Sequence, residues 1–411
     1  MTTIAVVGLG YIGLPTAAIL ATHGADVIGV DVSERTVNAV NAGTVPFVEP
    51  DLEISVAGAV SQGRLRAQLE TPEADVYIVA VPTPFHADQS PDLSYIEAAA
   101  DGIAAQLVGG ELVILESTSP PGATQLMADR ILAARPDLNP GGRSLVDFAH
   151  CPERVLPGRV MVELVTNDRI IGGLSRVAAE RARDVYALFC QGELVLTDAT
   201  TAELSKLVEN SFRDVNIAFA NELSVVAQKF GVDVWELIEL ANRHPRVDIL
   251  QPGPGVGGHC IAVDPWFIVA GAPEESRLIR MAREVNDAKP EFVIADVIAK
   301  ANRLKAPRIA ALGLAFKPDI DDLRESPALN IVEALAQRLP DAEIVAVEPH
   351  IEELPKRLAA HSNITLVPLD EAVAGADIVV ALVDHTQFKQ ADRRKLRLKE
   401  KVVIDTRGVW R

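Results

Sequence analysis

The sequence predicts an α/β protein in which two Rossmann-like, doubly wound domains are joined by a central helical domain with one long helix. Short apolar runs alternate with longer Ala- and Leu-rich segments over about the first 200 residues, a long helical pattern follows, and the alternation then returns. Continuous apolar runs are typical of strands covered on both faces, as in a parallel sheet. We therefore expect three domains, over residues 1–199, 200–301 and 302–411.

Six apolar runs supply the strands expected in the first domain. They are Ile4–Val7, Val27–Val30, Val76–Val81, Leu112–Glu116, Leu145–Ala149 and Ile170–Gly173. Four more runs predict the sheet of the third domain, and they are Arg308–Leu314, Glu343–Pro349, Asp377–Val383 and Lys401–Arg407. The run IAALGLA echoes IAVVGLG near the start of the chain, so two related nucleotide-type folds would flank a cleft.

The central domain opens with a helical pattern from Thr200 to Gly231. Its apolar positions recur at three-, four- and seven-residue steps, and they are Leu204, Val208, Val215, Phe219, Leu223 and Val226. Gly231 is a suitable C-terminal stop. A helix of this length is either a seam between two subunits or a buried element of one chain, and the pattern fits both.

Composition limits the class of protein. The formal charge of −18 disfavours a nucleic-acid binder, which needs a basic face, and it means that any anionic ligand requires a local cluster of Arg, Lys and backbone N–H groups. The spacing of Cys151, Cys190 and Cys260 fits neither a metal knuckle nor a disulfide framework, so no metal is expected. With no long apolar run and no signal-like N-terminus, we expect a cytoplasmic protein.

The stretch GLGYIG follows the first predicted strand and precedes a helix. We expect the dinucleotide pyrophosphate at Gly8, Gly10, Tyr11, Ile12 and Gly13. Asp31 ends the second strand about 20 residues later, where a carboxylate binds the adenosine ribose and repels a 2′-phosphate, which favours NAD over NADP. Arg35 lies near enough to serve a phosphate instead. Thr83 and Thr118 follow the next two strands and are candidate ligand contacts, or simply turn hydroxyls.

Two further groups of residues suggest chemistry. One face of the long helix carries Lys206, Asn210 and Arg213. This face is either a polar surface in contact with solvent or a set of donors to an oxyanion in a cleft. Cys260 lies in GPGVGGHCIAVDP, where His259, the next helix N-terminus and a nearby lysine would favour its thiolate form. The preceding glycines suit a backbone that passes close to a ligand. On these residues alone, a packed core side chain and a nucleophile are almost equally well supported as roles for Cys260. Asp264 before Pro265 is a good helix cap.

Several longer motifs resemble the nucleotide-sugar dehydrogenase family, also called the UDP-glucose/GDP-mannose dehydrogenase family. In chain order they are GLGYIG, AVPTP, ESTSPPG, CPERVLPG, KLVENSFRDVNIAFANEL, NRHPRVDILQPGPGVGGHCIAVDPWF and GLAFKPDIDDLRESPA. Around the cysteine the sequence resembles UDP-glucose dehydrogenases less closely than members that act on a 2-acetamido sugar. The resemblance implies a four-electron oxidation of a UDP-sugar at C6 with two NAD⁺, for polysaccharide biosynthesis.

The same resemblance assigns roles to individual residues. Cys260 would form a thiohemiacetal and then a thioester, Lys206 and Asn210 would stabilise oxyanions, and Asp264, Thr118 and Glu153 would move protons or position water. The residues implied for UDP-sugar binding are Arg154, Val155, Lys206, Asn210, Arg213, Gly257, Phe316, Lys317, Arg324 and Arg407. His244 and Arg246 resemble residues that reach the substrate of a neighbouring subunit, which implies a homodimer through the central domain.

Several alternatives stay open at this stage. A two-electron dehydrogenase of similar architecture would need no cysteine and would release one NADH per sugar. A nucleotide-binding regulator without turnover would have no reason to keep Lys206, Asn210, Cys260 and Asp264 together. UDP-N-acetylglucosamine and UDP-glucose are alternative substrates, and Arg324 could be a surface ion pair.

Overall fold

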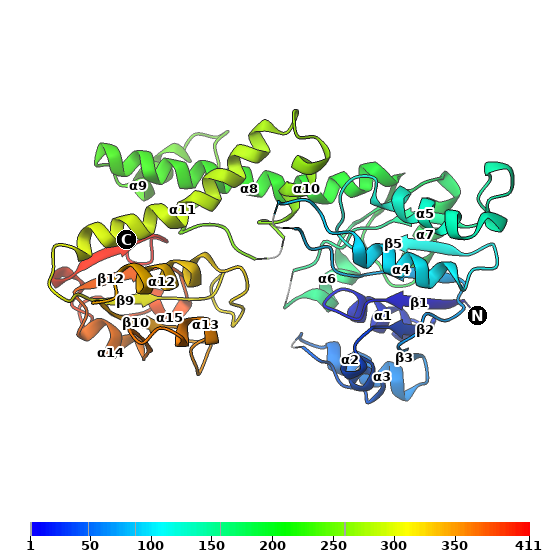
Figure 1. The fold of residues 1–411 in the computed structure, drawn as a ribbon, viewed down its shortest axis with the longest axis horizontal. Helices are drawn as coiled ribbons and strands as arrows, with labels where there is room; N and C mark the ends of the chain where they lie inside the picture. Colours follow the sequence, from blue (N-terminus) through cyan, green and yellow to red (C-terminus); the bar gives the residue numbers. More distant parts are fainter. Residues whose placement is uncertain (1, 48, 87, 157, 259) are drawn as a thin grey trace. The chain divides into compact units, whose positions relative to one another are not determined.

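The computed structural model describes residues 2–47, 49–86, 88–156, 158–258 and 260–411, so His259 lies outside the described residues. The chain forms two compact units (Figure 1). The first contains Met1–Glu209 and Trp266–Pro273, and the second contains Asn210–Pro265 and Glu274–Arg411. The three predicted domain ranges stay a prediction. None of the helices formed by the described residues combines the length and the apolar character that a membrane span needs.

The first unit is built on an eight-stranded sheet in the order β3-β2-β1-β4-β5-β6-β7-β8. The strands are β1 (Thr3–Val7), β2 (Asp26–Val30), β3 (Leu65–Gln68), β4 (Val76–Val79), β5 (Leu112–Leu115), β6 (Asp147–His150), β7 (Arg169–Gly173) and β8 (Leu194–Asp198). All neighbours are parallel except β6 and β7. The six predicted runs form strands, whereas the two edge strands β3 and β8 were not predicted.

Helices cover both faces of this sheet (Figure 1). They are α1 (Gly13–Thr22), α2 (Glu34–Asn41), α3 (Leu52–Ser61), α4 (Ser94–Ala104), α5 (Ala123–Ala134), α6 (Val160–Thr166) and α7 (Arg176–Tyr186), with short 3₁₀ turns at Pro136–Leu138 and Pro140–Gly142. Ile4 and Val6 of β1 belong to one buried cluster, whereas Ala5 and Val7 belong to another. Successive side chains of a strand point to opposite faces, so a strand between two cores is apolar throughout, as the sequence indicated.

The central part of the chain is helical. It comprises α8 (Ala199–Phe230), α9 (Val234–Ala241), α10 (Asp264–Gly271) and α11 (Arg277–Ala301). The predicted long helix is α8, with 32 residues, and Gly231 follows it at φ +67°, which a residue with a side chain rarely adopts. Asp264 is the first residue of α10, within one residue of the predicted cap position.

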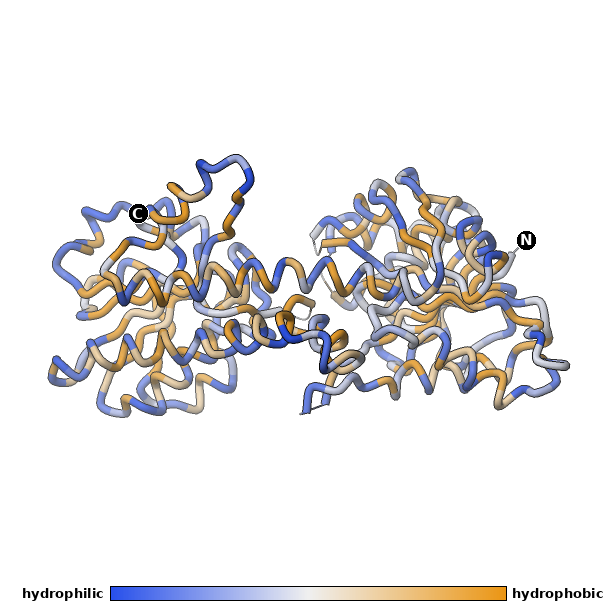
Figure 2. Tube along the Cα trace, turned by 90° about the horizontal axis from the view of Figure 1, so that it is seen from above, coloured by the Kyte–Doolittle hydropathy of each residue, from blue (hydrophilic) through white to orange (hydrophobic). Residues whose placement is uncertain are grey.

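The second unit holds a five-stranded parallel sheet in the order β11-β10-β9-β12-β13. Its strands are β9 (Arg308–Leu312), β10 (Glu343–Val347), β11 (Ile364–Leu366), β12 (Ile378–Ala381) and β13 (Val402–Asp405). Its other helices are α12 (Pro327–Arg338), α13 (Lys356–Ala359), α14 (Leu369–Ala374) and α15 (Thr386–Lys389), with a 3₁₀ turn at Leu398–Glu400. Apolar residues are concentrated in the interior of each unit (Figure 2).

The strand order locates the ligand edge of each sheet. In the first unit the chain leaves β1 towards β2 and later returns to β4 on the other side of β1. In the second unit β9 is flanked in the same way by β10 and β12. Ligands of open parallel sheets bind beyond the carboxyl ends of the strands at such a reversal point. This topology would place one nucleotide at the end of β1 and another at the end of β9.

Candidate active site

The loop after β1 is shaped by its glycines. Gly8 has φ +95°, and a Cβ there would lie 2.5 Å from the carbonyl oxygen of Ala80. A Cβ at Gly13 would lie 1.8 Å from the carbonyl oxygen of Gly8, so the loop and α1 can approach only without side chains. A Cβ at Gly10 would meet no atom within 4 Å. The open space beside Gly10, at the N-terminus of α1, fits a pyrophosphate group that is bound by backbone N–H groups.

Asp31 is held in place beside this loop. Its Oδ2 accepts a hydrogen bond of 2.9 Å from the Leu9 N–H, and its Oδ1 accepts one of 2.9 Å from the Ser33 N–H. A carboxylate oxygen has two lone pairs, so each oxygen can accept a second bond from a ribose hydroxyl. Arg35 is exposed in the first turn of α2. These residues fit an adenine dinucleotide in which the ribose hydroxyls are free.

The two predicted threonines lie together at the carboxyl edge of the first sheet. The hydroxyl of Thr83 donates to the carbonyl oxygen of Thr118, and Ser117 Oγ donates to the Val81 carbonyl at 2.7 Å. Thr118 itself is partly exposed. The hydroxyl hydrogen of Thr83 is therefore used in a hydrogen bond to the backbone. Of the two threonines, Thr118 is the better candidate for a side-chain contact with a ligand.

Glu153 belongs to a buried ionic cluster that the sequence did not reveal. Its Oε2 accepts a hydrogen bond of 2.8 Å from Arg169 Nη2, and its Oε1 accepts one of 2.6 Å from the Arg154 N–H. Arg169 Nη1 lies 3.8 Å from Oε1 of Glu116, which also accepts bonds from Thr16 and Tyr186. One buried arginine thus faces two buried carboxyl groups.

The second carboxyl group of this cluster is largely neutral at moderately acidic pH. Burial, together with the charge of Glu153, raises the pKa of Glu116 from 4.5 to about 7. Burial also raises the pKa of the Cys151 thiol to about 12, which makes that thiol a poor nucleophile. Cys190 is half-buried and Cys260 is exposed, so exposure favours Cys260 as the reactive cysteine.

We expect replacement of Glu116 by glutamine to flatten the pH dependence of stability. Because the pKa of Glu116 is raised in the folded protein, folding takes up a proton between pH 4.5 and about 7, and the wild type loses stability as the pH rises through that window. At about 1.4 kcal/mol per pKa unit, the E116Q variant should gain a few kcal/mol relative to the wild type between pH 4.5 and 7.5. Urea unfolding at several pH values measures this gain, and parallel curves for the two proteins would contradict it.

Arg154 and Val155 occupy different environments in the first unit. The Arg154 guanidinium pairs with Glu209 on α8, with Nη2 and Oε1 2.7 Å apart, and lines an open groove with Asn167 and Asp168. Val155 packs against the first core, so its backbone is the part that can reach a ligand.

The polar face of α8 leads to the cysteine loop. Lys206 is half-buried, Asn210 is buried one turn later, and Arg213 is exposed. Asn210 Nδ2 donates to Asp264 Oδ2 at 2.5 Å, and the N–H of Asp264 donates to the Cys260 carbonyl oxygen at 2.8 Å. The second unit therefore brings Asn210 close to Cys260 and Asp264, which follow it in the sequence by 50 and 54 residues.

The glycines before Cys260 have a reason that the sequence did not predict. A Cβ at Gly257 would lie 2.4 Å from the Glu325 carbonyl oxygen and 2.6 Å from Pro327 Cδ. Gly258 has φ +86°, and a Cβ there would lie 3.0 Å from the Phe316 ring. The loop needs glycine because it passes close to other parts of the second unit, so a bound ligand is not required to explain these residues.

Three of the predicted UDP-binding residues line one cavity of the second unit. Phe316, Lys317 and Arg407 surround it together with Asp384, at the carboxyl ends of β9 and β12. Arg407 forms an ion pair with Asp384, with Nη2 and Oδ1 2.8 Å apart, and the sequence did not single out Asp384. Arg324 pairs with Asp322 at 2.7 Å on the surface, which matches the alternative interpretation of this residue, and it does not line this cavity.

The second unit repeats the geometry of the dinucleotide loop, with one difference. Gly313 has φ +93°, and Glu348 at the end of β10 accepts bonds from the Leu314 and Ala315 N–H groups at 2.7 and 3.0 Å. However, Glu348 Oε2 also contacts His385 Nε2 at 3.1 Å and is buried. The carboxylate that corresponds to Asp31 is thus occupied by the protein itself.

One group of metal-type ligand atoms comes together among the described residues. It consists of Asp319, His350 and His385. His385 Nδ1 accepts a bond of 3.0 Å from the Asp319 N–H, while Nε2 faces Glu348. Both ring nitrogens therefore serve the protein, and the group fixes the loop that carries Phe316 and Lys317.

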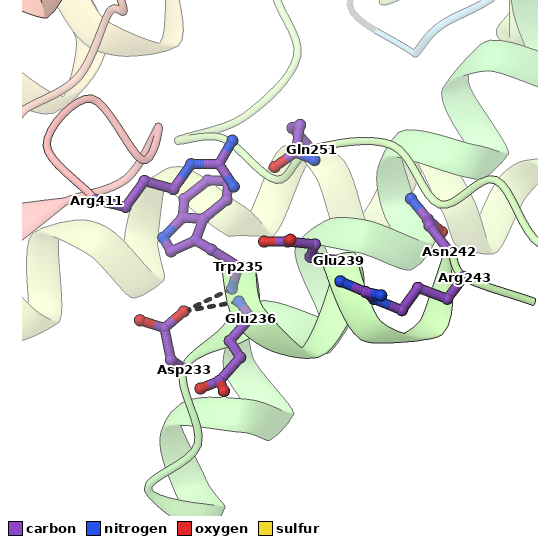
Figure 3. Close-up of a pocket in the computed structure, with 8 residues that line it drawn as sticks. All are labelled: Asp233, Trp235, Glu236, Glu239, Asn242, Arg243, Gln251 and Arg411. Atoms are coloured by element: carbon purple, nitrogen blue, oxygen red, sulfur yellow. Dashed lines mark hydrogen bonds between the residues drawn. The ribbon is translucent and has the colours of Figure 1, made fainter.

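A groove of about 770 Å³ runs along α9 (Figure 3). The Arg411 guanidinium lies over the Trp235 ring, 5.2 Å from its centroid, and Asp233 caps the helix through the Trp235 and Glu236 N–H groups. None of the residues predicted for catalysis or substrate binding lines this groove.

The nearby loop carries His244 and Arg246, which are exposed. The Asn242 side chain closes this loop, because it donates to the Ile249 carbonyl at 3.0 Å and accepts from the Ile249 N–H at 2.8 Å.

The two Rossmann-like sheets, each with a glycine turn after its first strand and a carboxylate after its second, are the architecture of a protein that binds two nucleotides. Residues 2–190 match the NAD binding domain of the UDP-glucose/GDP-mannose dehydrogenase family, residues 200–288 its central domain and residues 310–411 its UDP binding domain. The chain belongs to this family.

Individual relatives cover the whole chain. It is 58% identical to the NDP-N-acetyl-D-galactosaminuronic acid dehydrogenase of Ralstonia nicotianae, over 99% of this chain and 96% of the relative. It is 55% identical to the UDP-N-acetyl-D-mannosamine dehydrogenase of Escherichia coli, over 100% and 99%. The solved UDP-D-ManNAc dehydrogenase of Pyrococcus horikoshii is similar with a TM-score of 0.87 at 40% identity, over 100% of this chain and 96% of that one.

Proposed function

We propose that this protein oxidises UDP-N-acetyl-D-mannosamine at C6 to UDP-N-acetyl-D-mannosaminuronate, in a four-electron reaction through a thiohemiacetal and a thioester on Cys260. The observation that carries this proposal is the exposed Cys260 beside the Asn210–Asp264 pair, in a chain that has both an NAD binding and a UDP binding domain. A two-electron dehydrogenase would have no use for a cysteine in this position.

The residues of the chain divide the chemistry among them. Bound NAD⁺ supplies the hydride acceptor for both oxidations. The Cys260 sulfur adds to the C6 carbonyl carbon, so that a C–S bond forms and the oxygen takes a proton. After the second hydride has left, a water molecule attacks the thioester carbon, the C–S bond breaks, and the carboxylate and the thiol are released. One alcohol and one water thereby become one carboxylate, with two hydrides transferred.

Polar groups on α8 and α10 support these steps. Asp264 orients the Asn210 amide through the 2.5 Å bond, and the second amide hydrogen can donate to an oxyanion. Lys206, one turn earlier on α8, supplies a positive charge to the same oxygen. Thr118 and Glu153 stay candidates for positioning the hydrolytic water. Because Glu153 is bonded to Arg169, it is better suited to accept a hydrogen bond than to donate one.

A second candidate substrate has support of its own. The 58% identity to an NDP-N-acetyl-D-galactosaminuronic acid dehydrogenase favours the N-acetylgalactosamine series. In favour of the mannosamine series are the E. coli relative at 55% and the solved structures at 40% and 41% identity, from Pyrococcus horikoshii and Staphylococcus aureus. The two sugars differ in ring stereochemistry, so the shape of the sugar-binding pocket would determine which one is bound.

The substrate is tested by purified protein, NAD⁺ and a panel of UDP-sugars. The panel contains the N-acetyl forms of mannosamine, galactosamine and glucosamine, and glucose. We expect UDP-N-acetyl-D-mannosamine to give the highest kcat/KM, since one misplaced hydroxyl or acetamido group leaves buried polar groups unpaired. A higher kcat/KM for another sugar would overturn the choice of sugar, and no turnover on any 2-acetamido sugar would overturn the proposed function.

We also propose that the protein is a homodimer joined through its central domain, located in the cytoplasm and active in polysaccharide biosynthesis. Five large apolar side chains on α8 are exposed and follow a four- and seven-residue spacing. They are Val208 at 53%, Phe212 at 69%, Phe219 at 53%, Val226 at 43% and Phe230 at 74% exposure. Such a stripe on a long helix is typical of a helix–helix seam.

We expect Phe219→Asp to separate the proposed dimer into monomers, because it places a charge in the middle of the apolar stripe. Analytical ultracentrifugation measures the mass of the wild type and the variant. Lys229→Asp, an exposed change on the same helix, is the control that should stay dimeric. A monomeric wild type, or a dimeric F219D protein, would contradict this interface.

A further inference from the structure

The loop that carries Cys260 has no regular secondary structure from Gly253 to Gly258. Its conformation must therefore be fixed by contacts with neighbouring elements and not by its own backbone ladder. On one side it touches Phe316 and Pro327, as its glycines require. On the other side it is bonded to buried polar side chains of α8 and α11 that the proposed reaction does not use.

These side chains form one continuous hydrogen-bonded network. Asn221 Nδ2 donates to Asn286 Oδ1 at 2.8 Å, and Asn286 Nδ2 donates to Asp214 Oδ1 at 2.8 Å. Arg283 Nη1 also donates to Asp214 Oδ1, at 2.5 Å. All four residues are 0% or 1% exposed, in a chain where buried polar groups cost stability unless they are paired.

The network reaches the cysteine loop at two points. Asn221 Oδ1 accepts a hydrogen bond of 2.8 Å from the Gly253 N–H, where the loop begins. Arg283 Nη1 lies 3.5 Å from the carbonyl oxygen of Ile261, the residue after Cys260. The two ends of the segment that presents the sulfur are therefore tied to the same rigid pair of helices.

We propose that Asn221 and Arg283 are positioning residues, which hold the Cys260 loop so that the sulfur can capture the aldehyde before it escapes. Attack on a carbonyl requires the two atoms to approach closely in the correct direction, and displacements of about 1 Å cost large factors in rate. Asp214 and Asn286 act indirectly, because they orient the side chains of Asn221 and Arg283. This inference rests on the proposed four-electron oxidation.

The chain offers a matched control for the loss of a buried polar contact. Lys289 is on α11 and is 7% exposed, and its Nζ donates to Ser224 Oγ of α8 at 2.5 Å. It therefore links the same two helices, but none of the hydrogen bonds found for it goes to the cysteine loop. Lys289→Met should weaken the packing of α8 on α11 without changing how Cys260 is held.

The first experiment measures what fraction of the aldehyde is oxidised a second time and what fraction escapes and is trapped. NADH per sugar is determined with an aldehyde-trapping hydroxylamine present for the wild type, N221A, R283K and K289M. The lysine of R283K keeps a positive charge but lacks the planar, fixed set of N–H donors with which the guanidinium contacts Asp214 and the Ile261 carbonyl. We expect close to two NADH per sugar for the wild type and K289M, and a fall towards one for N221A and R283K. The ratio is set within each turnover, so partial unfolding does not change it.

The second experiment does not depend on turnover. The rate at which iodoacetamide alkylates Cys260 is followed by peptide mass in the same four proteins. We expect a change of about five-fold or more in N221A and R283K, and less than two-fold in K289M, because burial and orientation of a thiol set its reactivity. Equal rates in all four proteins, or the same change in K289M, would overturn the inference. A wild type that releases one NADH while alkylation still differs would instead overturn the proposed function.

Discussion

Replacement of Cys260 by serine is expected to stop the reaction after the first oxidation. The first hydride leaves from the alcohol and does not need the sulfur, so NADH should still form once per sugar. A serine hydroxyl is a weaker nucleophile than a thiol because it is far less ionised near neutral pH, and its ester is hydrolysed more slowly than a thioester. NADH per sugar should therefore fall from two to one or less, with steady turnover reduced by at least about 1,000-fold.

A matched cysteine controls this experiment. Cys190 is half-buried in the first unit, and its sulfur donates to the Asn167 carbonyl at 3.4 Å. Cys190→Ser should keep two NADH per sugar and nearly the wild-type rate. If C260S also produced two NADH per sugar at an unchanged rate, the covalent role of Cys260 would be wrong.

Replacement of Lys206 by methionine has the second largest expected effect. Removal of one donor to a developing oxyanion typically lowers kcat by about 10²- to 10³-fold. KM for the UDP-sugar should change only a few-fold, because Lys206 does not line the cavity proposed for the nucleotide, which is formed by other residues such as Phe316, Lys317 and Arg407. Steady-state kinetics at saturating NAD⁺ give both quantities.

The same helix provides the control for Lys206. Lys229 is exposed in the last turn of α8, so K229M removes one charge from the same helix. We expect K229M to keep kcat within about two-fold of the wild type. A K206M variant with a normal kcat, or with a loss confined to KM, would remove Lys206 from the oxyanion site.

Much of the architecture was predictable because each core strand is covered on both faces. The apolar runs of β1 and β9 and the spacing of α8 are local patterns, and local patterns survive in the fold. The strands that escaped prediction lie at sheet edges, and they are β3 and β8 of the first sheet and β11 of the second. In β3 and β8, polar residues such as Arg66 and Thr197 interrupt the apolar run. The hydrophobic periodicity that identifies a strand is therefore weak in these segments.

The candidate site shows the same division. Asp31 and the glycine loop were predictable because their chemistry depends on short spacings along the chain. Asp384, Glu116 and Arg169 were not singled out, since each acts through a partner that is remote in sequence. The glycines before Cys260 were predicted to let the backbone approach a ligand, whereas the structure explains Gly257 and Gly258 by their approach to Phe316 and Pro327. The partners are 23 residues apart for Asp384 and Arg407 and 53 apart for Glu116 and Arg169, and such pairs are set by tertiary packing, which one sequence does not display.

In the proposed reaction, a single chain carries one alcohol through two oxidations on the same cysteine. The most direct test is the number of NADH released per UDP-N-acetyl-D-mannosamine consumed by the purified wild type, with the sugar limiting and the product identified by mass. We expect two NADH per sugar, a uronic acid product, and no free aldehyde. One NADH per sugar with an aldehyde or ketone product would contradict it.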